Sequence, residues 1–268
     1  MDIENAKRIV VKVGTSTLTH KGGRLNLRRV ENLVKVLCDL SNSGKEIILV
    51  SSGAIGVGVG KLGLKERPKE NKDKQAVAAV GQCELMFIYD KFFGEYNHNI
   101  AQVLLTKFAV DTDYKKQNVI NTIDALLDMG IIPIVNENDT VAIDELDGEN
   151  FGDNDRLSAI VAEIVNADLL ILLTDIDGLY TTNPREDPNA EKIDVVEEIT
   201  DEIRTMAGGT GSSRGTGGMR TKIIAAEIAT QAGIDMCIIN GENPKRLYHL
   251  LEGKPIGTLF KSQAKLAD

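Results

Sequence analysis

The chain has 268 residues, of which 42% are hydrophobic and 26% charged, and these values exclude a disordered chain and indicate one large or two small folded domains. Its formal net charge of -9 would repel a phosphate backbone, and with no Trp and 4% aromatic residues it offers little on which bases could stack. We therefore expect no nucleic acid among its partners.

Short apolar runs rich in Val and Ile alternate along the chain with longer segments of helical period. Strands that are apolar on both faces and separated by crossover helices are typical of a parallel sheet covered by helices. We therefore expect an α/β fold, a three-layer α/β/α sandwich around a mainly parallel sheet. The predicted strands span residues 8–13, 46–51, 100–106, 131–136, 168–174 and 235–240. The predicted helices span residues 26–43, 72–97, 113–129, 153–166, 219–232 and 244–252.

The first predicted strand ends with Lys12 and Val13, and Gly14, Thr15 and Ser16 follow it. In open parallel sheets, ligands bind beyond the carboxyl ends of the strands. Because it lacks a Cβ, Gly14 would let a phosphate approach the backbone, which favours a binding role for Lys12. The alternative is a solvated lysine at the strand edge.

The second predicted strand runs into a glycine-rich segment, SSGAIGVG at residues 51–58. Backbone amides at the start of a helix there could bind an anion. Tight packing between strand and helix is the alternative explanation of these glycines.

An acidic segment, NENDTVAIDELDGENFGDND, spans residues 136–155. It does not fit the calcium-loop pattern. Its carboxylates and carboxamides, next to a strand end and a helix start, suit an ammonium ion or could hold two lysines at a transferring phosphate. A solvated acidic face is the alternative.

Two segments in the second half of the chain could contact a ligand. Residues 168–184, DLLILLTDIDGLYTTNP, place Thr174 and Asp175 just beyond a buried strand, where an ordinary turn is the alternative. Residues 208–222, GGTGSSRGTGGMRTK, end with Lys222 in the first turn of a predicted helix. A lysine there opposes the helix dipole unless an anion lies nearby, so we expect residues 215–222 to bind one. A slack linker is the alternative, and we retain it for residues 208–213.

The three cysteines, Cys38, Cys83 and Cys237, contain no Cys-x-x-Cys pair, which argues against a zinc site or a disulfide framework and fits a reducing cytoplasm. The apolar run near the N-terminus is too short for a signal peptide, and no run approaches the length of a membrane span. We therefore expect a cytoplasmic protein without membrane contact.

Several motifs together resemble the amino acid kinase family: KVGTS, SSGAIGVG, AAVGQ, VNENDTVA, FGDND with LSA, LLTDIDGLYTTNP and GTGGMRTK. The resemblance extends from Lys12 to GTLF at residues 257–260, and NEND, GDND and GTGGM are most similar to the members that phosphorylate glutamate. It implies a single domain over residues 1–268. About 1–167 would form a glutamate-binding lobe and about 168–268 a lobe that binds ATP, with Mg²⁺ held mainly by the ATP phosphates.

The resemblance also assigns roles to residues. It implies that Lys12 and Lys222 bridge the phosphates and that Asp155 aligns the two lysines. The residues that it assigns to glutamate are Ser52, Asp139, Asp153 and Asn154. The residues that it assigns to the nucleotide are Lys12, Thr174, Asp175, Thr216, Gly217, Gly218, Met219, Arg220, Thr221 and Lys222.

The activity that the resemblance implies is ATP-dependent phosphorylation of L-glutamate to L-glutamate 5-phosphate, the first step of proline biosynthesis, with inhibition by proline. It also implies a homo-oligomer, a dimer or tetramer. It raises the hypothesis that the product passes directly to glutamate-5-semialdehyde dehydrogenase. A side-chain carboxylate with a pKa of about 4.3 is ionised at neutral pH and needs no general base, which agrees with three histidines that lie outside every motif.

Two alternatives stay open. One is another acyl kinase of the same fold, such as N-acetylglutamate kinase, although Asp139 and Asp153 favour a substrate with a free ammonium group. The other is a non-catalytic nucleotide or amino-acid sensor, although a sensor has no need of two lysines and Asp155. The segment at 140–152 is longer than is usual in the family. The chain ends at Asp268, where many relatives continue into a domain of the kind found in RNA-modifying enzymes, so we expect no RNA role.

Overall fold

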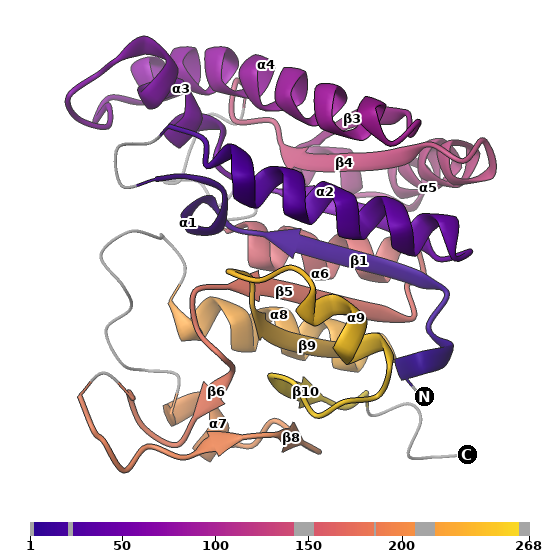
Figure 1. The fold of residues 1–268 in the computed structure, drawn as a ribbon, viewed down its shortest axis with the longest axis vertical. Helices are drawn as coiled ribbons and strands as arrows, with labels where there is room; N and C mark the ends of the chain where they lie inside the picture. The colour runs from indigo at the N-terminus through magenta and orange to yellow at the C-terminus, as the bar shows by residue number, and fades with distance from the viewer. Residues whose placement is uncertain (1–2, 21–23, 142–152, 185, 207–217, 263–268) are drawn as a thin grey trace.

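The computed structural model describes residues 3–20, 24–141, 153–184, 186–206 and 218–262. Within these residues an eight-stranded sheet has the order β3-β4-β2-β1-β5-β9-β10-β8, and β6 pairs with β7 in a small second sheet (Figure 1). The strands are β1 (Arg8–Val13), β2 (Glu46–Ser51), β3 (Ile100–Leu105), β4 (Ile132–Glu137), β5 (Leu169–Thr174), β6 (Leu179–Tyr180), β7 (Lys192–Ile193), β8 (Val195–Val196), β9 (Asp235–Asn240) and β10 (Thr258–Phe260).

The helices cover both faces of the large sheet (Figure 1). The α-helices are α1 (Thr15–Leu18), α2 (Leu27–Asn42), α3 (Ala54–Leu62), α4 (Asn71–Glu95), α5 (Asp113–Asp128), α6 (Asn154–Ile164), α7 (Asp201–Met206), α8 (Met219–Gln231) and α9 (Arg246–Leu251). Two short 3-10 helices are η1 (Ile3–Asn5) and η2 (Lys107–Val110). None of the helices in the described part of the chain is long and apolar enough to cross a membrane.

The alternation of side chains along the strands divides the core into two layers. On one face, Ile9 and Val11 of β1 pack in a cluster with side chains of α2, α4 and α9. On the other face, Val10 of β1 packs in a cluster with side chains of α5, α6 and α8. All neighbouring strands of the large sheet run parallel except β10, which is antiparallel to β9. The predicted three-layer α/β/α sandwich around a mainly parallel sheet is therefore confirmed.

The six predicted strands and six predicted helices are all present, with ends that coincide or differ by at most two residues. A helix start was considered in the segment 51–58, but α3 is not among the six predicted helices, because residues 53–60 contain four glycines, which have low helix propensity. The helix begins after Gly53, whose φ of 109° is one that a side chain would strain. The short elements α1, α7, β6, β7, β8 and β10 were also missed.

The glycines of α3 and α4 let these two helices approach closely. A Cβ built on Gly81 would lie 1.8 Å from the carbonyl oxygen of Ala54, and one built on Gly58 would lie 2.1 Å from the carbonyl oxygen of Val77. Both neighbours are backbone atoms, which cannot rotate away. The close packing at Gly58 is therefore between two helices, and not between strand and helix as the alternative explanation had it.

This close approach predicts opposite effects for two substitutions in α4. Gly81→Ala should lower the free energy of unfolding by about 2–3 kcal/mol, because the added methyl group forces the helices apart. Gly94→Ala is the matched control, since its Cβ would meet no atom within 4 Å, and it should leave stability unchanged or raise it by up to ~1 kcal/mol. Urea denaturation of both variants measures the difference. Equal stabilities would contradict the close contact.

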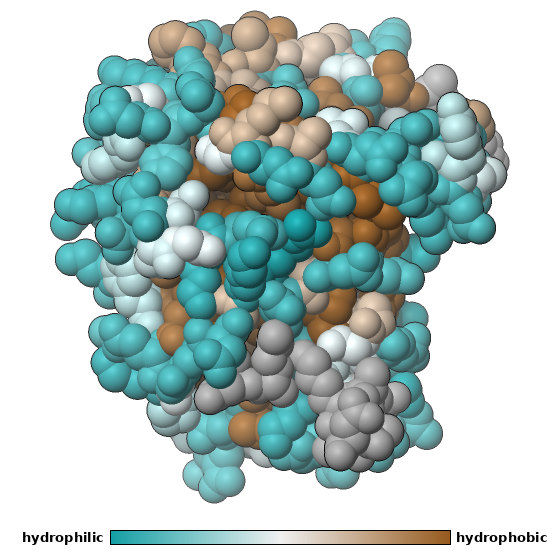
Figure 2. Space-filling view, turned by 90° about the vertical axis from the view of Figure 1, so that its right-hand side faces the viewer, coloured by the Kyte–Doolittle hydropathy of each residue, from teal (hydrophilic) through white to brown (hydrophobic). Residues whose placement is uncertain are grey.

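The amino ends of the six strands from β3 to β9 in the sheet order lie on the side of the molecule that Figure 2 shows, where mostly hydrophilic residues surround patches of hydrophobic surface. Arg8 ties several elements together at the start of β1. Its guanidinium lies 2.7 Å from Glu46 of β2 and 2.9 Å from Asp124 of α5, and it donates to the carbonyl oxygen of Val165 at 2.8 Å. The backbone amide of Arg8 donates to Asp168, just before β5, at 2.8 Å. This charged cluster therefore connects β1, β2, α5 and the start of β5 at the amino ends of the strands.

Candidate active site

The candidate site lies at the carboxyl ends of β1, β2, β4 and β5, where strands far apart in sequence become neighbours (Figure 1). Lys12 of β1 is level with Val50 of β2 on one side and with Leu172 of β5 on the other. The first turns of α6 and α8 approach the same ends of the strands, because these two helices pack against each other on one face of the sheet. Chain segments separated by more than a hundred residues therefore meet at one point.

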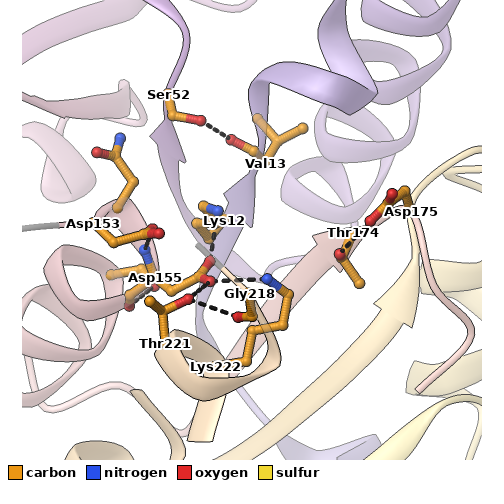
Figure 3. A network of polar contacts seen from close by, with 12 residues as sticks. Lys12, Val13, Ser52, Asp153, Asp155, Thr174, Asp175, Gly218, Thr221 and Lys222 are labelled. Carbon is orange, nitrogen blue, oxygen red and sulfur yellow. Dashed lines mark hydrogen bonds and ion pairs between the residues drawn. The ribbon is translucent and has the colours of Figure 1, made fainter. Parts of the chain in front are cut away.

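Asp155 lies between two lysines in this site (Figure 3). Its Oδ1 is 2.5 Å from the Nζ of Lys12, and its Oδ2 is 3.0 Å from the Nζ of Lys222. Lys12 and Lys222 are each only 7% exposed, and Asp155 is 1% exposed. The solvated position considered for Lys12 is therefore wrong, and two buried ammonium groups share one carboxylate.

The local sequence places Asp155 for this contact. Asp153 is the N-cap of α6, and its side chain accepts a hydrogen bond from the backbone amide of Asp155 at 2.8 Å. Asp155 then stands in the first turn of α6, where the helix dipole favours a negative charge. Lys222 stands in the first turn of α8, where the dipole opposes a positive charge, and the carboxylate of Asp155 supplies the anion that this position requires.

Thr221 connects Asp155 to the glycine-rich segment. Its hydroxyl lies 3.0 Å from Oδ2 of Asp155 and 2.9 Å from the carbonyl oxygen of Gly218, the N-cap of α8 (Figure 3). One hydroxyl proton can serve only one of these two acceptors at a time. The start of α8 is thereby linked to the carboxylate that holds both lysines.

The two neighbouring carboxylates at the start of α6 ionise differently. Burial opposes the ionisation of Asp155, but the ammonium groups of Lys12 and Lys222 outweigh it and hold the pKa of Asp155 well below its usual range. Burial raises the pKa of Asp153, and the negative charge of Asp155 adds to this rise, although both lysines oppose it. Asp155 is therefore firmly ionised, and a cation placed beside Asp153 would stabilise the ionised form of that carboxylate.

Three of the residues assigned to glutamate binding line the part of the site next to β2 and β4. Burial raises the pKa of Asp139, just beyond β4, and the positive charge of Arg67 opposes the rise. The hydroxyl of Ser52 donates to the carbonyl oxygen of Val13 at 3.1 Å, which ties the end of β2 to the end of β1 (Figure 3). Asn154, the first residue of α6, donates from Nδ2 to Oδ1 of Asn136 at 2.8 Å.

Asn136 and Gln82 also lie in this part of the site. Asn136 belongs to the segment 136–155 that was predicted to suit an ammonium ion, without a role of its own, and no role was predicted for Gln82. Asn136 lies in β4 and donates from Nδ2 to Oε1 of Gln82 in α4 at 2.9 Å. Both side chains are buried. A buried glutamine in an otherwise apolar helix face, in the motif AAVGQ, was the available signal, since buried amides need partners.

The residues assigned to the nucleotide lie on the side of β5 and α8. Thr174 ends β5, and its hydroxyl lies 3.3 Å from Oδ1 of Asp175 (Figure 3). Gly218, Met219, Arg220 and Thr221 form the start of α8, with Arg220 exposed. A Cβ built on Gly14, after β1, would lie 3.7 Å from the Nζ of Lys12, so the glycine leaves the ammonium group open on that side. The remaining assigned residues, Thr216 and Gly217, lie outside the described residues, as do residues 208–213 and most of the segment 140–152.

Comparison with known proteins identifies this arrangement. A family model described as "Amino acid kinase family" matches residues 7–240. The chain belongs to the amino acid kinase family. The family indicated by the sequence motifs is therefore confirmed.

Curated relatives cover almost the whole chain. The glutamate 5-kinase of Clostridium perfringens (strain 13 / Type A) is 59% identical over 259 residues, which are 96% of this chain and 96% of the relative. The glutamate 5-kinase of Listeria monocytogenes serotype 4a (strain HCC23) is 55% identical over 262 residues, 97% of this chain and 95% of the relative. Identity at this level extends through both halves of the large sheet.

Solved structures of other kinases share the fold at low identity. The UMP kinase from Ureaplasma parvum has a TM-score of 0.67 at 14% identity and covers 96% of this chain and 99% of its own. The isopentenyl phosphate kinase product complex of T. acidophilum has a TM-score of 0.65 at 17% identity and covers 95% of this chain and 100% of its own. The chain thus shares its fold with these two kinases over nearly its whole length.

Proposed function

We propose that the protein is a glutamate 5-kinase that transfers a phosphoryl group from ATP to the side-chain carboxylate of L-glutamate, giving L-glutamate 5-phosphate. The observation that carries the proposal is the buried pair of lysines, Lys12 and Lys222, held at opposite oxygens of Asp155. Relatives of 54–59% identity that carry this name support the choice of reaction. This reaction is the first step of proline biosynthesis.

The proposed chemistry requires positioning and positive charge and no proton transfer. The acceptor carboxylate has a pKa of about 4.3 and is ionised at neutral pH, so no general base is needed to activate it. Negative charge on the transferring phosphoryl group calls for preorganised cations. Lys12 and Lys222 would supply them from opposite sides, while Asp155 keeps both ammonium groups in place.

The carboxylates near the glutamate side favour a free amino acid. Asp139 and Asp153 both have a pKa raised by burial. An ammonium group beside them would offset this unfavourable burial of charge, whereas an acetamido group would not. We therefore assign Ser52, Asp139, Asp153 and Asn154 to L-glutamate.

We assign ATP to the side of the site formed by β5 and α8, with contacts from Thr174, Asp175 and residues 216–222. In the described part of the chain, no group of three or more His, Cys, Asp or Glu side chains could hold a metal ion. Mg²⁺ prefers phosphate oxygens together with a few protein ligands, so we assign it mainly to the ATP phosphates, where it would neutralise their charge.

The division of the sheet suggests how the two substrates share one domain. The strands β1 to β4 come from the first part of the chain and lie together, and the other strands of the large sheet continue from β5. We propose that residues 1–167 form the glutamate lobe and residues 168–268 the ATP lobe. We also retain a cytoplasmic location, a dimer or tetramer, inhibition by proline, and transfer of the product to a semialdehyde dehydrogenase as parts of this proposal.

A hydroxamate assay tests the reaction and the substrate together. The protein is incubated with ATP, Mg²⁺ and hydroxylamine, which traps an acyl phosphate as its hydroxamate. We expect product with L-glutamate, and little with N-acetylglutamate or aspartate. Product from N-acetylglutamate but not from glutamate would show that the enzyme is another acyl kinase of this fold. Binding of ATP without product from any of the three would favour a sensor.

A further inference from the structure

Three side-chain amides form a hydrogen-bonded chain that ends at the glutamate side of the site. Asn154 donates from Nδ2 to Oδ1 of Asn136 at 2.8 Å, and Asn136 donates from Nδ2 to Oε1 of Gln82 at 2.9 Å. The three residues come from α6, β4 and α4. Gln82 and Asn136 are 7% and 2% exposed, and Asn154 is half-buried, so the amide chain runs from the interior toward the part of the site assigned to glutamate.

The orientation of Asn136 follows from a backbone contact. The amide of Glu137 donates to Oδ1 of Asn136 at 2.9 Å. A backbone N–H can only donate, so the atom that faces it must be the oxygen, and Nδ2 must face Gln82. Oε1 of Gln82 is then the matching acceptor. If the glutamine turned its NH₂ group toward Asn136, two buried donors would oppose each other and both would lose a partner.

The orientation of the Asn154 amide, at the other end of the amide chain, follows in the same way. Because Oδ1 of Asn136 can only accept, Asn154 must face it with Nδ2. The amide of Asn154 therefore turns its Oδ1 away from Asn136. That oxygen can accept a hydrogen bond from a substrate ammonium group, next to Asp153 and Asp155 in the same turn of α6. The donor and acceptor pattern offered to the ligand is set by residues that do not reach it.

We propose that Gln82 is a positioning residue for the amino-acid substrate, which acts through Asn136 to hold the Asn154 amide with its oxygen toward the ligand. This inference rests on the proposed phosphorylation of glutamate. The place of Gln82 is itself fixed, because the preceding Gly81 lies against the backbone of Ala54 in α3. Loss of its acceptor oxygen leaves Nδ2 of Asn136 without that partner, so that the Glu137 amide and Asn154 alone hold the Asn136 side chain. Asn136 and Asn154 are then held less firmly, and this weakens the contact with the substrate ammonium group but not the contacts with ATP.

The test uses Gln82→Met, which has a similar shape but lacks the acceptor. We expect KM for glutamate to rise about tenfold, the effect of one hydrogen bond to a charged group, with kcat and KM for ATP within twofold of wild type. Tyr89→Phe is the matched control, because it removes a buried 2.9 Å hydrogen bond to Ser51 from the same helix without touching the amide chain. It should lower Tm but leave KM for glutamate unchanged.

A double-mutant cycle separates positioning from a general effect on folding. In an Asn154→Ala background, Gln82→Met should change KM for glutamate by less than twofold, because the residue through which Gln82 acts is gone. A tenfold change in both backgrounds would overturn the proposal, as would an unchanged KM in the single variant. If Gln82→Met does not fold, Gln82→Glu keeps an acceptor oxygen for Asn136 and should hold KM within threefold; a tenfold rise there would also overturn it. Wild-type protein that makes no hydroxamate from glutamate would refute the proposed function instead.

Discussion

Lys222→Ala should lower kcat by roughly a hundredfold to a thousandfold, the range found when one preorganised donor is removed from a developing negative charge. Lys222, in the first turn of α8, is buried, and its ammonium group lies 3.0 Å from Asp155. The substitution leaves Asp155 paired with Lys12, so the protein should stay folded with a Tm close to that of wild type. Steady-state kinetics with glutamate and ATP measures kcat and KM. Calorimetric titration measures the affinity for ATP, and thermal denaturation measures Tm.

The matched control is Lys254→Ala, which removes the same charge from an exposed lysine that pairs with Glu252 in the turn after α9. Its kcat should equal that of wild type. A sensor would respond differently, because loss of Lys222 would weaken nucleotide binding and there would be no kcat to lose. If Lys222→Ala raised KM for ATP while kcat stayed within threefold, Lys222 would only bind ground-state nucleotide, and the proposed role in transfer would be wrong.

The sequence predicted the fold well because local signals and tertiary packing agree in most of the chain. The runs RIVVKV and LLILLT are buried on both faces, and a parallel central strand needs that pattern. Where packing against another helix decides the local structure, the residues of the segment alone did not predict it. Residues 54–62 form a helix despite their glycines because α4 lies against them at Gly81, and a contact of that kind has no signature in the segment itself.

The sequence indicated individual residues of the site more readily than the contacts between them. Lys12 and Lys222 were notable from the sequence, one at a strand end and the other at the positive end of a helix. The acidic segment at 136–155 was predicted to suit two lysines, but Asp155 itself was singled out by the family resemblance, because it lies 143 residues from Lys12 and 67 from Lys222 along the chain. The roles of Gln82 and Asn136 were harder still to predict, since a side-chain amide can donate or accept and only its neighbours in the fold decide which.

Asp155→Asn should be strongly destabilising as well as inactive, because it removes the carboxylate that both buried ammonium groups contact. Removal of one partner from a buried ion pair costs about 3–5 kcal/mol, and here one carboxylate serves two lysines. Urea denaturation at pH 7 measures the loss. The control, Glu197→Gln, removes the carboxylate of an exposed pair with Lys261 and should cost less than about 1 kcal/mol.

The pH dependence of this difference gives a sharper test than its size. The pKa of Asp155 in the folded protein is held well below the value of about 3.9 for an unperturbed Asp, so its ionised form contributes stability that is fully present above that value. That contribution falls as the pH drops below it, toward the folded pKa. The gap in unfolding free energy between wild type and Asp155→Asn should therefore be constant from about pH 5 to pH 8 and narrow in stronger acid. A gap that stayed the same at pH 3 would mean that the variant is destabilised by altered packing, and that Asp155 does not act through its charge.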